Sequence, residues 1–208
     1  MTVWPRTRRT SGLITDGGAC RYTAVLDACV LYSVLMSDAL MSLAVRGLFA
    51  AKWSVRIEDE WMRSLELRRP ELVGKLAFRR DCMREAVSDW EVPELAIGKL
   101  LPCLELPDPD DRHVLAAAIA GHADCIVTAN VRDFPPEILE PYGIEVVGPD
   151  RFIINQWDLR PYEAITAFKR MRGRWRRPET SADDFADVFE RGGLPATALR
   201  LREVRELI

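Results

Sequence analysis

Short apolar runs and longer stretches of helical spacing alternate along most of the 208-residue chain. A short continuous apolar run is typical of a buried strand, and apolar residues three or four positions apart are typical of a helix packed on a core. The runs predict buried strands at 22–26, 125–128 and 145–147, and a further short strand near 101–104 in an otherwise irregular stretch. The helical spacing predicts helices at 29–49 and 112–120 and a short helical turn within 135–143. After a brief link at 52–54, a helix is expected from 54 onward, with an apolar stripe of Ile57, Trp61 and Leu65. Another helix is expected from 70 onward, with a core face of Leu72, Leu76, Met83 and Val87.

Capping residues mark the ends of several of these helices. Ser54 precedes one helix, and Asp110 or Asp111 precedes the helix at 112–120, which Gly121 ends. Ser and Asp side chains accept hydrogen bonds from the free N–H groups at a helix start, and Gly is favoured just beyond a helix end.

Strand and helix signals alternate as far as Gly148, and the rest of the chain is predicted to be helical. This alternation predicts an α/β fold in which a parallel sheet carries helices on both faces. The closing helices are expected at 151–157, 161–175, 182–190 (capped by Ser181) and 195–207. We therefore expect a leader at 1–20 that is disordered or a mis-assigned start, an α/β domain at 21–150, and a small helical C-terminal extension at 151–208.

Composition narrows the class of protein without identifying it. The chain is 48% hydrophobic and 29% charged, as is ordinary for a globular protein, and no apolar run reaches the roughly 20 residues that span a bilayer. A formal net charge of -3 gives no general case for nucleic-acid binding. Five cysteines without a CxxC pair and only two histidines argue against a zinc site and for a reducing cytoplasm. Cys29, Cys103 and Cys125 lie in or beside apolar runs and are expected to be buried.

Acidic residues border these elements at positions that are expected to converge. Asp27 ends the apolar run 24–26, and Asp108, Asp110 and Asp111 crowd the start of the helix at 112–120. The carboxyl ends of strands and the amino ends of helices meet in the crevice of an open α/β sheet. Because close carboxylates raise one another's pKa unless a cation lies among them, the pattern predicts a divalent-metal site.

Structural roles also explain these residues one at a time. Asp27 is suited to cap the following helix, and the segment 128–134 is suited to form an Asn- and Asp-stabilised loop. Glu60 shares the first turns of a helix with Glu58 and Asp59, where carboxylates interact favourably with the helix dipole. Glu60 is preferred over its neighbours as a site residue because it borders the apolar stripe.

The kind of metal follows from the ligands. Oxygen ligands without a Cys/His cluster favour Mg²⁺ or Mn²⁺. Mg²⁺ usually takes one or two carboxylates directly, so the other acids would hold its water ligands. Such a site suits the attack of a metal-activated water on phosphorus.

Four ordered blocks of the chain resemble the PIN-domain ribonucleases, and most closely the VapC-type toxins of bacterial toxin–antitoxin pairs. The blocks are 25–31, Trp53-Ser54 followed by Glu60, 108–118 and 127–134. The resemblance implies a PIN-like three-layer α/β/α sandwich and Mg²⁺- or Mn²⁺-dependent endoribonuclease activity on RNA. It also implies control by a VapB-like antitoxin and a homodimer. In the tail, Phe152, Pro178 and Gly193-Leu194 resemble the C-terminal extension of a longer VapC subgroup.

The resemblance implies a set of site residues by position. The catalytic set is Asp27, Glu60, Asp111, Thr128, Asn130 and Asp133, with Asp27 and Asp111 as metal ligands. The doubled acid leaves the third position open between Asp110 and Asp111. The fourth position is shared between Asn130 and Asp133, because family members differ in which of the two positions carries the acid.

The tail segment 169–177 places basic residues around Trp175. Such a segment can hold phosphates while the ring stacks on a base. It can equally be a solvated helix end with Trp175 against the core, or a surface for an acidic antitoxin segment. The expected RNA-binding residues are Arg112, Arg132, Arg174, Trp175 and Arg176.

Two other classes of protein compete with the nuclease hypothesis. One is a PIN-like module that has lost catalysis and works by binding RNA or protein; the near-complete set of acids argues against it. The other is an Asp-nucleophile phosphatase, which needs a second aspartate two residues after the first. This chain has Cys29 at that position.

Overall fold

A parallel sheet forms the centre of the computed structural model, which describes residues 22–175 and 179–208. The strands lie in the order β2-β1-β3-β4. Their bounds are β1 (Thr23–Leu26), β2 (Ala50–Lys52), β3 (Cys125–Val127) and β4 (Glu145–Val147). β1 and β3 pair along their length and are almost entirely buried, which explains why both are continuous apolar runs. The α/β prediction is confirmed, and the expected leader at 1–20 lies outside the described residues.

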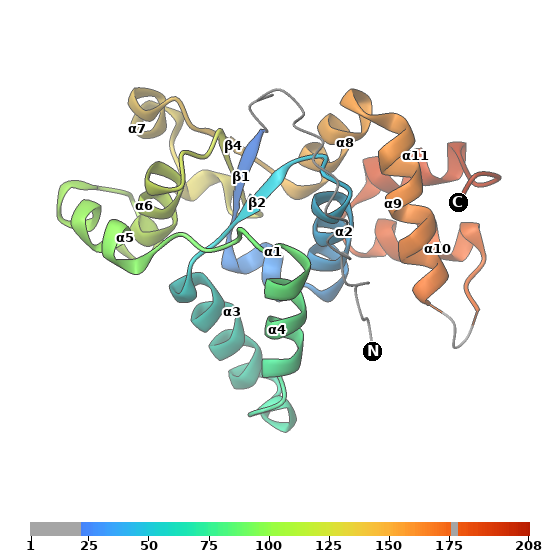
Figure 1. Ribbon diagram of the computed structural model, residues 1–208, viewed down its shortest axis with the longest axis horizontal. Helices are drawn as coiled ribbons and strands as arrows, with labels where there is room; N and C mark the ends of the chain where they lie inside the picture. The colour runs from blue at the N-terminus through green and yellow to red at the C-terminus, as the bar shows by residue number, and fades with distance from the viewer. Residues whose placement is uncertain (1–21, 176–178) are drawn as a thin grey trace, which may run out of the picture.

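Helices flank this sheet on both sides. The described residues form α1 (Ala28–Tyr32), α2 (Val34–Val45), α3 (Val55–Arg68), α4 (Ala77–Ala86), α5 (Glu94–Leu100), α6 (Arg112–Ala120), α7 (Pro136–Leu139), α8 (Pro149–Leu159), α9 (Pro161–Arg174), α10 (Ala182–Arg191) and α11 (Pro195–Glu203). In Figure 1, α5 and α6 lie on one side of the sheet, and α2 and α8 lie on the other. The arrangement is the three-layer α/β/α sandwich expected from the sequence, followed by the expected C-terminal helices.

The helix expected at 29–49 is interrupted at Ser33. α1 ends there, and the Ser33 hydroxyl caps the start of α2. The guanidinium group of Arg79, on α4, donates hydrogen bonds to the carbonyl oxygens of residues 31–33. The Ser33 carbonyl also accepts from the Ser37 N–H at the start of α2, whereas a continuous helix would have bonded the carbonyls of Leu31 and Tyr32 internally as well. A residue remote in sequence therefore stabilises the break.

Three expectations about local structure were wrong. The stretch 101–104 is no strand, because α5 continues into a 3-10 helix there and leaves Cys103 exposed. The link at 52–54 includes the end of β2. The helix expected from Pro70 begins only at Ala77, because the chain turns at Gly74 in a left-handed conformation that glycine adopts most easily.

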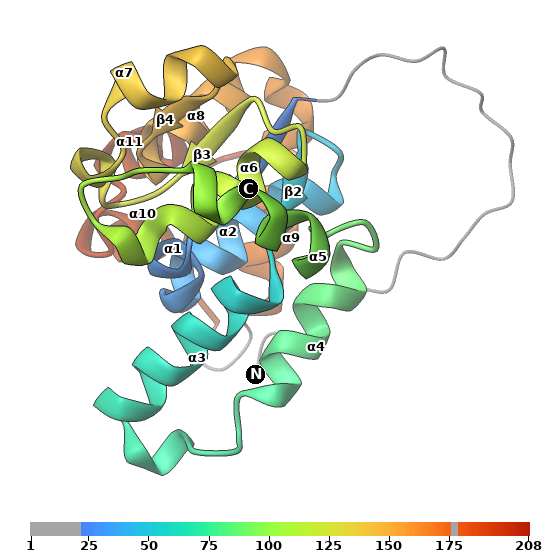
Figure 2. The ribbon, with the colours of Figure 1, turned by 90° about the vertical axis from the view of Figure 1, so that its left-hand side faces the viewer.

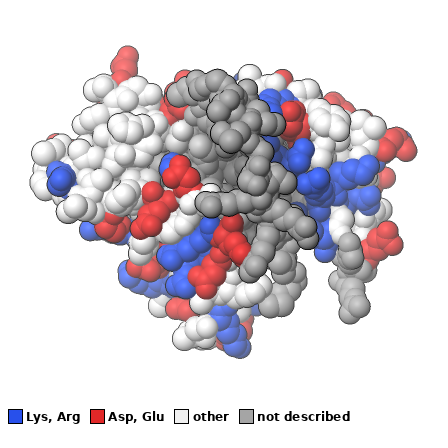
Figure 3. All heavy atoms as spheres, viewed as in Figure 1, with Lys and Arg blue, Asp and Glu red and all other residues white. Residues whose placement is uncertain are grey.

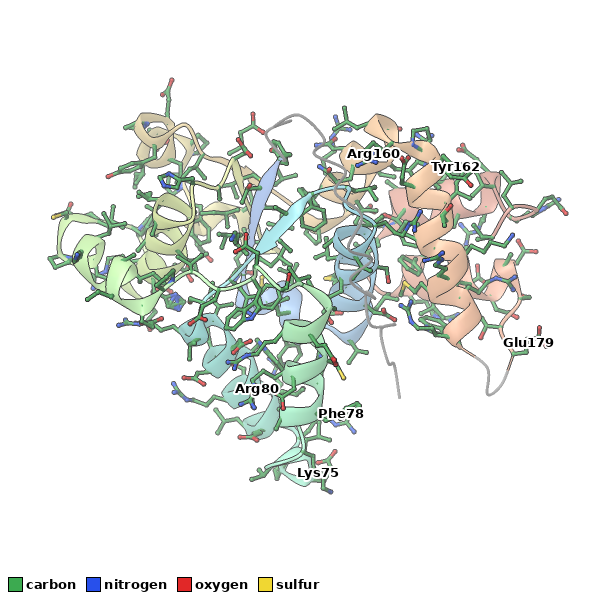
Figure 4. The ribbon with its side chains drawn as sticks, in the orientation of Figure 1. Lys75, Phe78, Arg80, Arg160, Tyr162 and Glu179 are labelled. Carbon is green, nitrogen blue, oxygen red and sulfur yellow. The ribbon has the colours of Figure 1, made fainter. Side chains whose placement is uncertain are left out.

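α3 and α4 project from the body of the molecule as an arm (Figures 1 and 2), with Lys75 and Phe78 toward its free end (Figure 4). A buried polar cluster holds the base of this arm. Glu58 accepts a hydrogen bond from the Trp53 indole N–H at 2.8 Å and is paired with the guanidinium group of Arg84. Because the Glu58 side chain is only 1% exposed, its charge depends on that cation.

The C-terminal helices pack on the body through α2 and α9. Arg174 forms an ion pair with buried Asp38 and donates a hydrogen bond to Ser42. Asp150, on α8, accepts hydrogen bonds from backbone N–H groups in the first turn of α11. Arg160 donates to the Gly47 carbonyl at 2.9 Å. In Figure 3, acidic and basic side chains lie side by side over the lower part of the molecule, whereas its upper left part is largely white. Within the described ranges, no helix has the length and apolar character needed to cross a bilayer.

Candidate active site

The candidate site begins at the carboxyl ends of β1 and β3. Asp27 directly follows β1, and its buried carboxylate accepts a hydrogen bond from the Thr128 hydroxyl at 2.6 Å. Thr128 directly follows β3, and its Oγ1 accepts from the Asn130 backbone N–H at 2.9 Å. As the sequence suggested, Asp27 also caps α1 by accepting from the Ala28 N–H. The helix cap uses the Oδ1 atom of Asp27, and the hydrogen bond from Thr128 uses Oδ2. Asp27 therefore caps α1 and also forms part of the site.

Cys29 is a site residue that the sequence reasoning treated only as an apolar filler. Its thiol donates to Asp27 Oδ2 at 3.0 Å, and its Sγ accepts from the Ala129 N–H at 3.2 Å. Burial, followed by the negative charge of Asp27, raises the pKa of the Cys29 thiol to about 12. The thiol therefore stays protonated at neutral pH and helps Thr128 to hold one oxygen of Asp27.

Glu60 reaches the same region from α3, which packs against α1. Burial raises the pKa of Glu60 to about 7, with further contributions from the charges of Asp27 and Asp111. Carboxylates influence one another in this way only when they lie close together. The structure therefore places Glu60 close enough to Asp27 and Asp111 for their charges to act on it, and we call these three residues the acidic group.

Asp111 completes this group from the loop before α6. The expected helix cap was wrong: Asp108, not Asp110 or Asp111, caps the turn by accepting from the Asp110 N–H, and Asp111 makes no side-chain cap hydrogen bond. The Asp111 carboxylate is thus left to face the site. Burial, then the charge of Asp27, and then the charges of Asp108 and Asp133 raise its pKa to about 7. Asp110 is exposed, which favours Asp111 for the third acidic position.

The fourth position has two candidates with different surroundings. Asp133 is half-buried in a 3-10 helix, and its charge raises the pKa of Asp111. Asn130 is exposed and uses its backbone N–H to hold Thr128. The electrostatic influence of Asp133 on Asp111 therefore favours Asp133 for the fourth acidic position. Asn130 contributes through its backbone N–H, which holds the Thr128 hydroxyl.

His113 also lies at the site, although the sequence reasoning gave it no role. Its Nε2 is 3.1 Å from Glu60 Oε2, and its Nδ1 is buried without a hydrogen-bond partner among the described residues. Burial, and then the charge of Arg56, lower the pKa of His113. The imidazole is therefore neutral at neutral pH. A histidine on the first turn of α6, two residues after the favoured acid, was the available signal.

Two cavities flank Glu60. One has a volume of about 720 Å³, and its charged lining includes Arg56, Arg63 and Arg112. The other has a volume of about 490 Å³ and is lined by Tyr32, Leu67 and Arg68, among others. Glu60 forms part of the wall of both. A chain-like ligand that filled both cavities would pass Glu60.

The structure distributes the expected RNA-binding residues over two regions. Arg112 lines the larger cavity, and Arg132 is exposed close to Asp133. Arg174 lies far along the chain and is paired with Asp38, so its charge is not offered to a ligand. Trp175 packs edge-on against Phe185, and Arg176 lies outside the described residues.

The acidic group offers oxygen ligands for a hard cation. Among the described residues, no three His, Cys, Asp or Glu side chains are arranged so that all could bind one ion directly. Mg²⁺ usually takes only one or two carboxylates and keeps several waters. The mutual repulsion of Asp27, Glu60 and Asp111 is also the kind that a cation relieves. The residues therefore fit a hydrated Mg²⁺ or Mn²⁺ ion better than a closed cage of protein ligands.

Comparison with known proteins places this site in a family. The PIN domain model matches residues 23–132, more than half of the chain, so the chain belongs to the PIN-domain family. The VapC50 C-terminal domain model matches residues 149–203. The chain is thus a PIN-domain protein of the VapC type with a C-terminal extension, as its sequence blocks had indicated.

One curated relative also carries the VapC50 name. The chain is 50% identical over 56 residues to a Mycobacterium tuberculosis protein named "Putative ribonuclease VapC50". The matched segment covers 27% of this chain and only about a third (32%) of that relative. Among solved structures, none matches the chain significantly.

Without added metal, we expect the acidic group to make the protein less stable as the pH rises from about 5 to 8. Glu60 and Asp111 have folded-state pKa values of about 7, above their ordinary values. At pH values between the ordinary pKa values of these groups and about 7, the folded state binds more protons than the unfolded state. The free energy of unfolding therefore falls with rising pH. The loss is complete above pH 7. Urea denaturation in EDTA measures it.

Glu60→Gln is the matching variant, because a glutamine cannot ionise. The variant is expected to lose less stability than the wild type between pH 5 and 8. Identical pH dependence in the two proteins would contradict the acidic group.

Proposed function

We propose that this protein is a metal-dependent endoribonuclease of the VapC type that hydrolyses RNA phosphodiesters. The observation that carries the proposal is the convergence of Asp27, Glu60 and Asp111: burial, followed by the charges of the neighbouring acids, raises the pKa values of Glu60 and Asp111 to about 7. Membership of the PIN-domain family and the name of the mycobacterial relative support it. Arg63 and Arg112, in the wall of the larger flanking cavity, offer cations to the phosphates of a polyanion.

In the proposed mechanism, bound Mg²⁺ or Mn²⁺ supplies an activated water and neutralises charge that develops on phosphorus. Asp27 and Asp111 are the direct ligands that we propose. Thr128 and Cys29 donate to Asp27 Oδ2, so they orient that carboxylate. Glu60 and Asp133 would accept hydrogen bonds from metal-bound waters. Thr128 and Asn130 therefore belong to the site as supporting residues.

The experiment that tests the function uses the full chain and total RNA. Incubation with Mg²⁺ or Mn²⁺ is expected to give discrete cleavage ends that can be mapped, and EDTA is expected to abolish them. Cleavage that persists in EDTA would contradict a metal-dependent mechanism. Binding without any cleavage would favour a PIN-like binding module.

Arg63 is expected to contribute phosphate binding and not chemistry. It lines the larger cavity beside Glu60, and no carboxylate lies within ion-pair distance of it in the described part of the chain. Arg63→Gln is therefore expected to weaken RNA binding several-fold for all sequences and to reduce the slope of log Kd against log salt by about one. Fluorescence anisotropy in EDTA at several salt concentrations measures both. Arg191→Gln, in the C-terminal extension, is the control, and equal slopes in the two variants would contradict the assignment.

The family relation also supports a regulatory context. We propose that a VapB-like antitoxin neutralises the enzyme, that the protein forms a homodimer, and that it acts as a toxin. Val73 and Phe78 are exposed apolar residues on the arm that such a partner would cover. The RNA substrate and the free thiols of Cys29, Cys82, Cys103 and Cys125 support a cytoplasmic location.

A further inference from the structure

Arg79 lies on α4, in the arm (Figure 2), but its guanidinium group ends at the junction between α1 and α2. It donates hydrogen bonds to the carbonyl oxygens of residues 31–33 and to the Ser37 hydroxyl at 2.7 Å. The last carbonyls of a helix have no partner inside that helix, so Arg79 satisfies the carbonyls at the end of α1. One side chain of the arm therefore holds the C-terminal end of α1.

The opposite end of α1 lies in the acidic group. Asp27 is the N-cap of this helix, which has only five residues. With a rise of about 1.5 Å per residue, α1 is roughly 7.5 Å long. So short a helix passes a shift of its C-terminal end directly to its N-terminal end. The contacts of Arg79 therefore bear on the position of the Asp27 carboxylate.

The flat face of the same guanidinium group covers the indole ring of Trp61. The Arg79 Cζ atom lies 4.7 Å from the centroid of that ring, which is the geometry of a cation–π contact. Trp61 is fully buried on α3 and directly follows Glu60, and α3 packs against α1. Arg79 thus contacts both the helix that Asp27 caps and the helix that carries Glu60.

These contacts require the shape of an arginine side chain. Burial lowers the pKa of Arg79 to about 10, and the charge of Asp38 acts in the opposite direction, so the group is a cation at neutral pH. A planar guanidinium group carries several N–H donors in a fixed fork, and it can bond a set of oxygens at its edge while its face stacks on a ring. A lysine ammonium group keeps the charge but cannot make both kinds of contact from one position.

We infer that Arg79 is a positioning residue for the active site, which sets the distance between Asp27 and Glu60 by fixing α1 against α3. The inference rests on the proposed metal-dependent nuclease and adds to it a residue outside the acidic group on which the metal site depends. Arg79 lines neither of the cavities beside Glu60, so it acts through α1 and Trp61 and not by touching RNA. A hydrated ion needs one carboxylate as a ligand and others at the distance of its bound waters, so the spacing of the two acids decides whether both can serve one ion.

The test compares Mn²⁺ binding by the full chain, without RNA, in the wild type, Arg79→Met, Arg79→Lys and Arg84→Met. Arg84 is the matched control, because it lies on the same helix, pairs with Glu58 on α3 and covers a tryptophan ring, that of Trp90, at 4.6 Å. Its side-chain hydrogen bonds within the described ranges go to Glu58, and none goes to α1. Electron paramagnetic resonance measures free Mn²⁺, and kcat and KM for RNA cleavage are measured at a temperature at which all four proteins are folded.

Arg79→Met is expected to weaken Mn²⁺ binding about tenfold and to lower kcat about tenfold, which is the usual scale for losing a group that orients metal ligands. KM for RNA is expected to change little. Arg79→Lys is expected to fall between Arg79→Met and the wild type, because it keeps the cation and loses the fork. Arg84→Met is expected to bind Mn²⁺ as the wild type does, although it destabilises the fold.

Two results would overturn the positioning role. Equal losses of Mn²⁺ affinity in Arg79→Met and Arg84→Met would show that both arginines only stabilise the fold. A change confined to KM, with Mn²⁺ affinity unaltered, would place Arg79 among the RNA contacts. If Arg79→Met does not fold, Arg79→Lys is compared with Arg84→Lys, and the same two results decide.

Failure of the positioning role and failure of the enzyme function remain separable. If the wild type binds Mn²⁺ but cleaves no RNA, the proposed function fails, and the Mn²⁺ affinities of the variants still decide the role of Arg79. If the wild type cleaves RNA and Arg79→Met keeps its Mn²⁺ affinity, the function stands and the positioning role fails. A wild type that binds no Mn²⁺ would overturn both.

Discussion

Asp27→Asn is expected to lower RNA cleavage by about a thousandfold or more, with the fold retained. The variant removes the charge at the centre of the acidic group and so weakens the metal that the mechanism requires. Asparagine caps a helix about as well as aspartate, so α1 keeps its N-cap. Single-turnover cleavage of a mapped RNA and thermal denaturation measure the two effects.

Asp124→Asn is the matched control for this experiment. Asp124 lies at the opposite end of the sheet, where its carboxylate accepts from the Thr23 N–H at 2.6 Å. Its replacement is expected to leave the cleavage rate unchanged. If both variants lose activity equally, the acidic group at the carboxyl ends of β1 and β3 is not the active site. An Asp27→Asn variant that cleaves RNA at the wild-type rate would also contradict the nuclease assignment.

Arg84→Met is expected to cost about 3 kcal/mol of the free energy of unfolding. Glu58 is buried at the base of the arm, and among the described residues the variant leaves its carboxylate hydrogen-bonded only to the Trp53 indole N–H. The Arg84 side chain is 34% exposed, which places the cost at the low end for a broken buried ion pair. Urea denaturation at pH 7 measures it.

Arg80→Met is the control on the same helix. Arg80 pairs with the exposed carboxylate of Asp81, and surface pairs of this kind contribute about 0–1 kcal/mol. The double variant Glu58→Gln/Arg84→Met is expected to recover part of the loss, because it buries no unpaired charge. Equal costs for Arg80→Met and Arg84→Met would show that Glu58 does not depend on its cation.

The sequence predicted the centre of this fold well, because the relevant signals are local. β1 and β3 are apolar runs that end at Asp27 and Thr128, and the ends of parallel strands must meet at one sheet edge. Ser54 and Ser181 cap the helices that they were expected to cap. The acidic site follows from these local facts together with the topology.

Signals that depend on distant partners were not available in the sequence. Glu58 and Glu60 lie two residues apart on one helix, yet the first is buried by Trp53 and Arg84, and the second faces the site. The break at Ser33 depends on Arg79. In the tail, Arg174 of the basic segment forms an ion pair with the buried Asp38, so its charge is not available to a ligand. Which charge meets which partner is decided by packing between elements.

The ion pair between Arg174 and Asp38 has a consequence for how such chains evolve. A shorter relative without the C-terminal helices would lose this cation beside a carboxylate in the interior of α2. It would also expose the face of α2 on which α9 packs. We therefore expect a lineage that discards the tail to carry a neutral residue in place of Asp38.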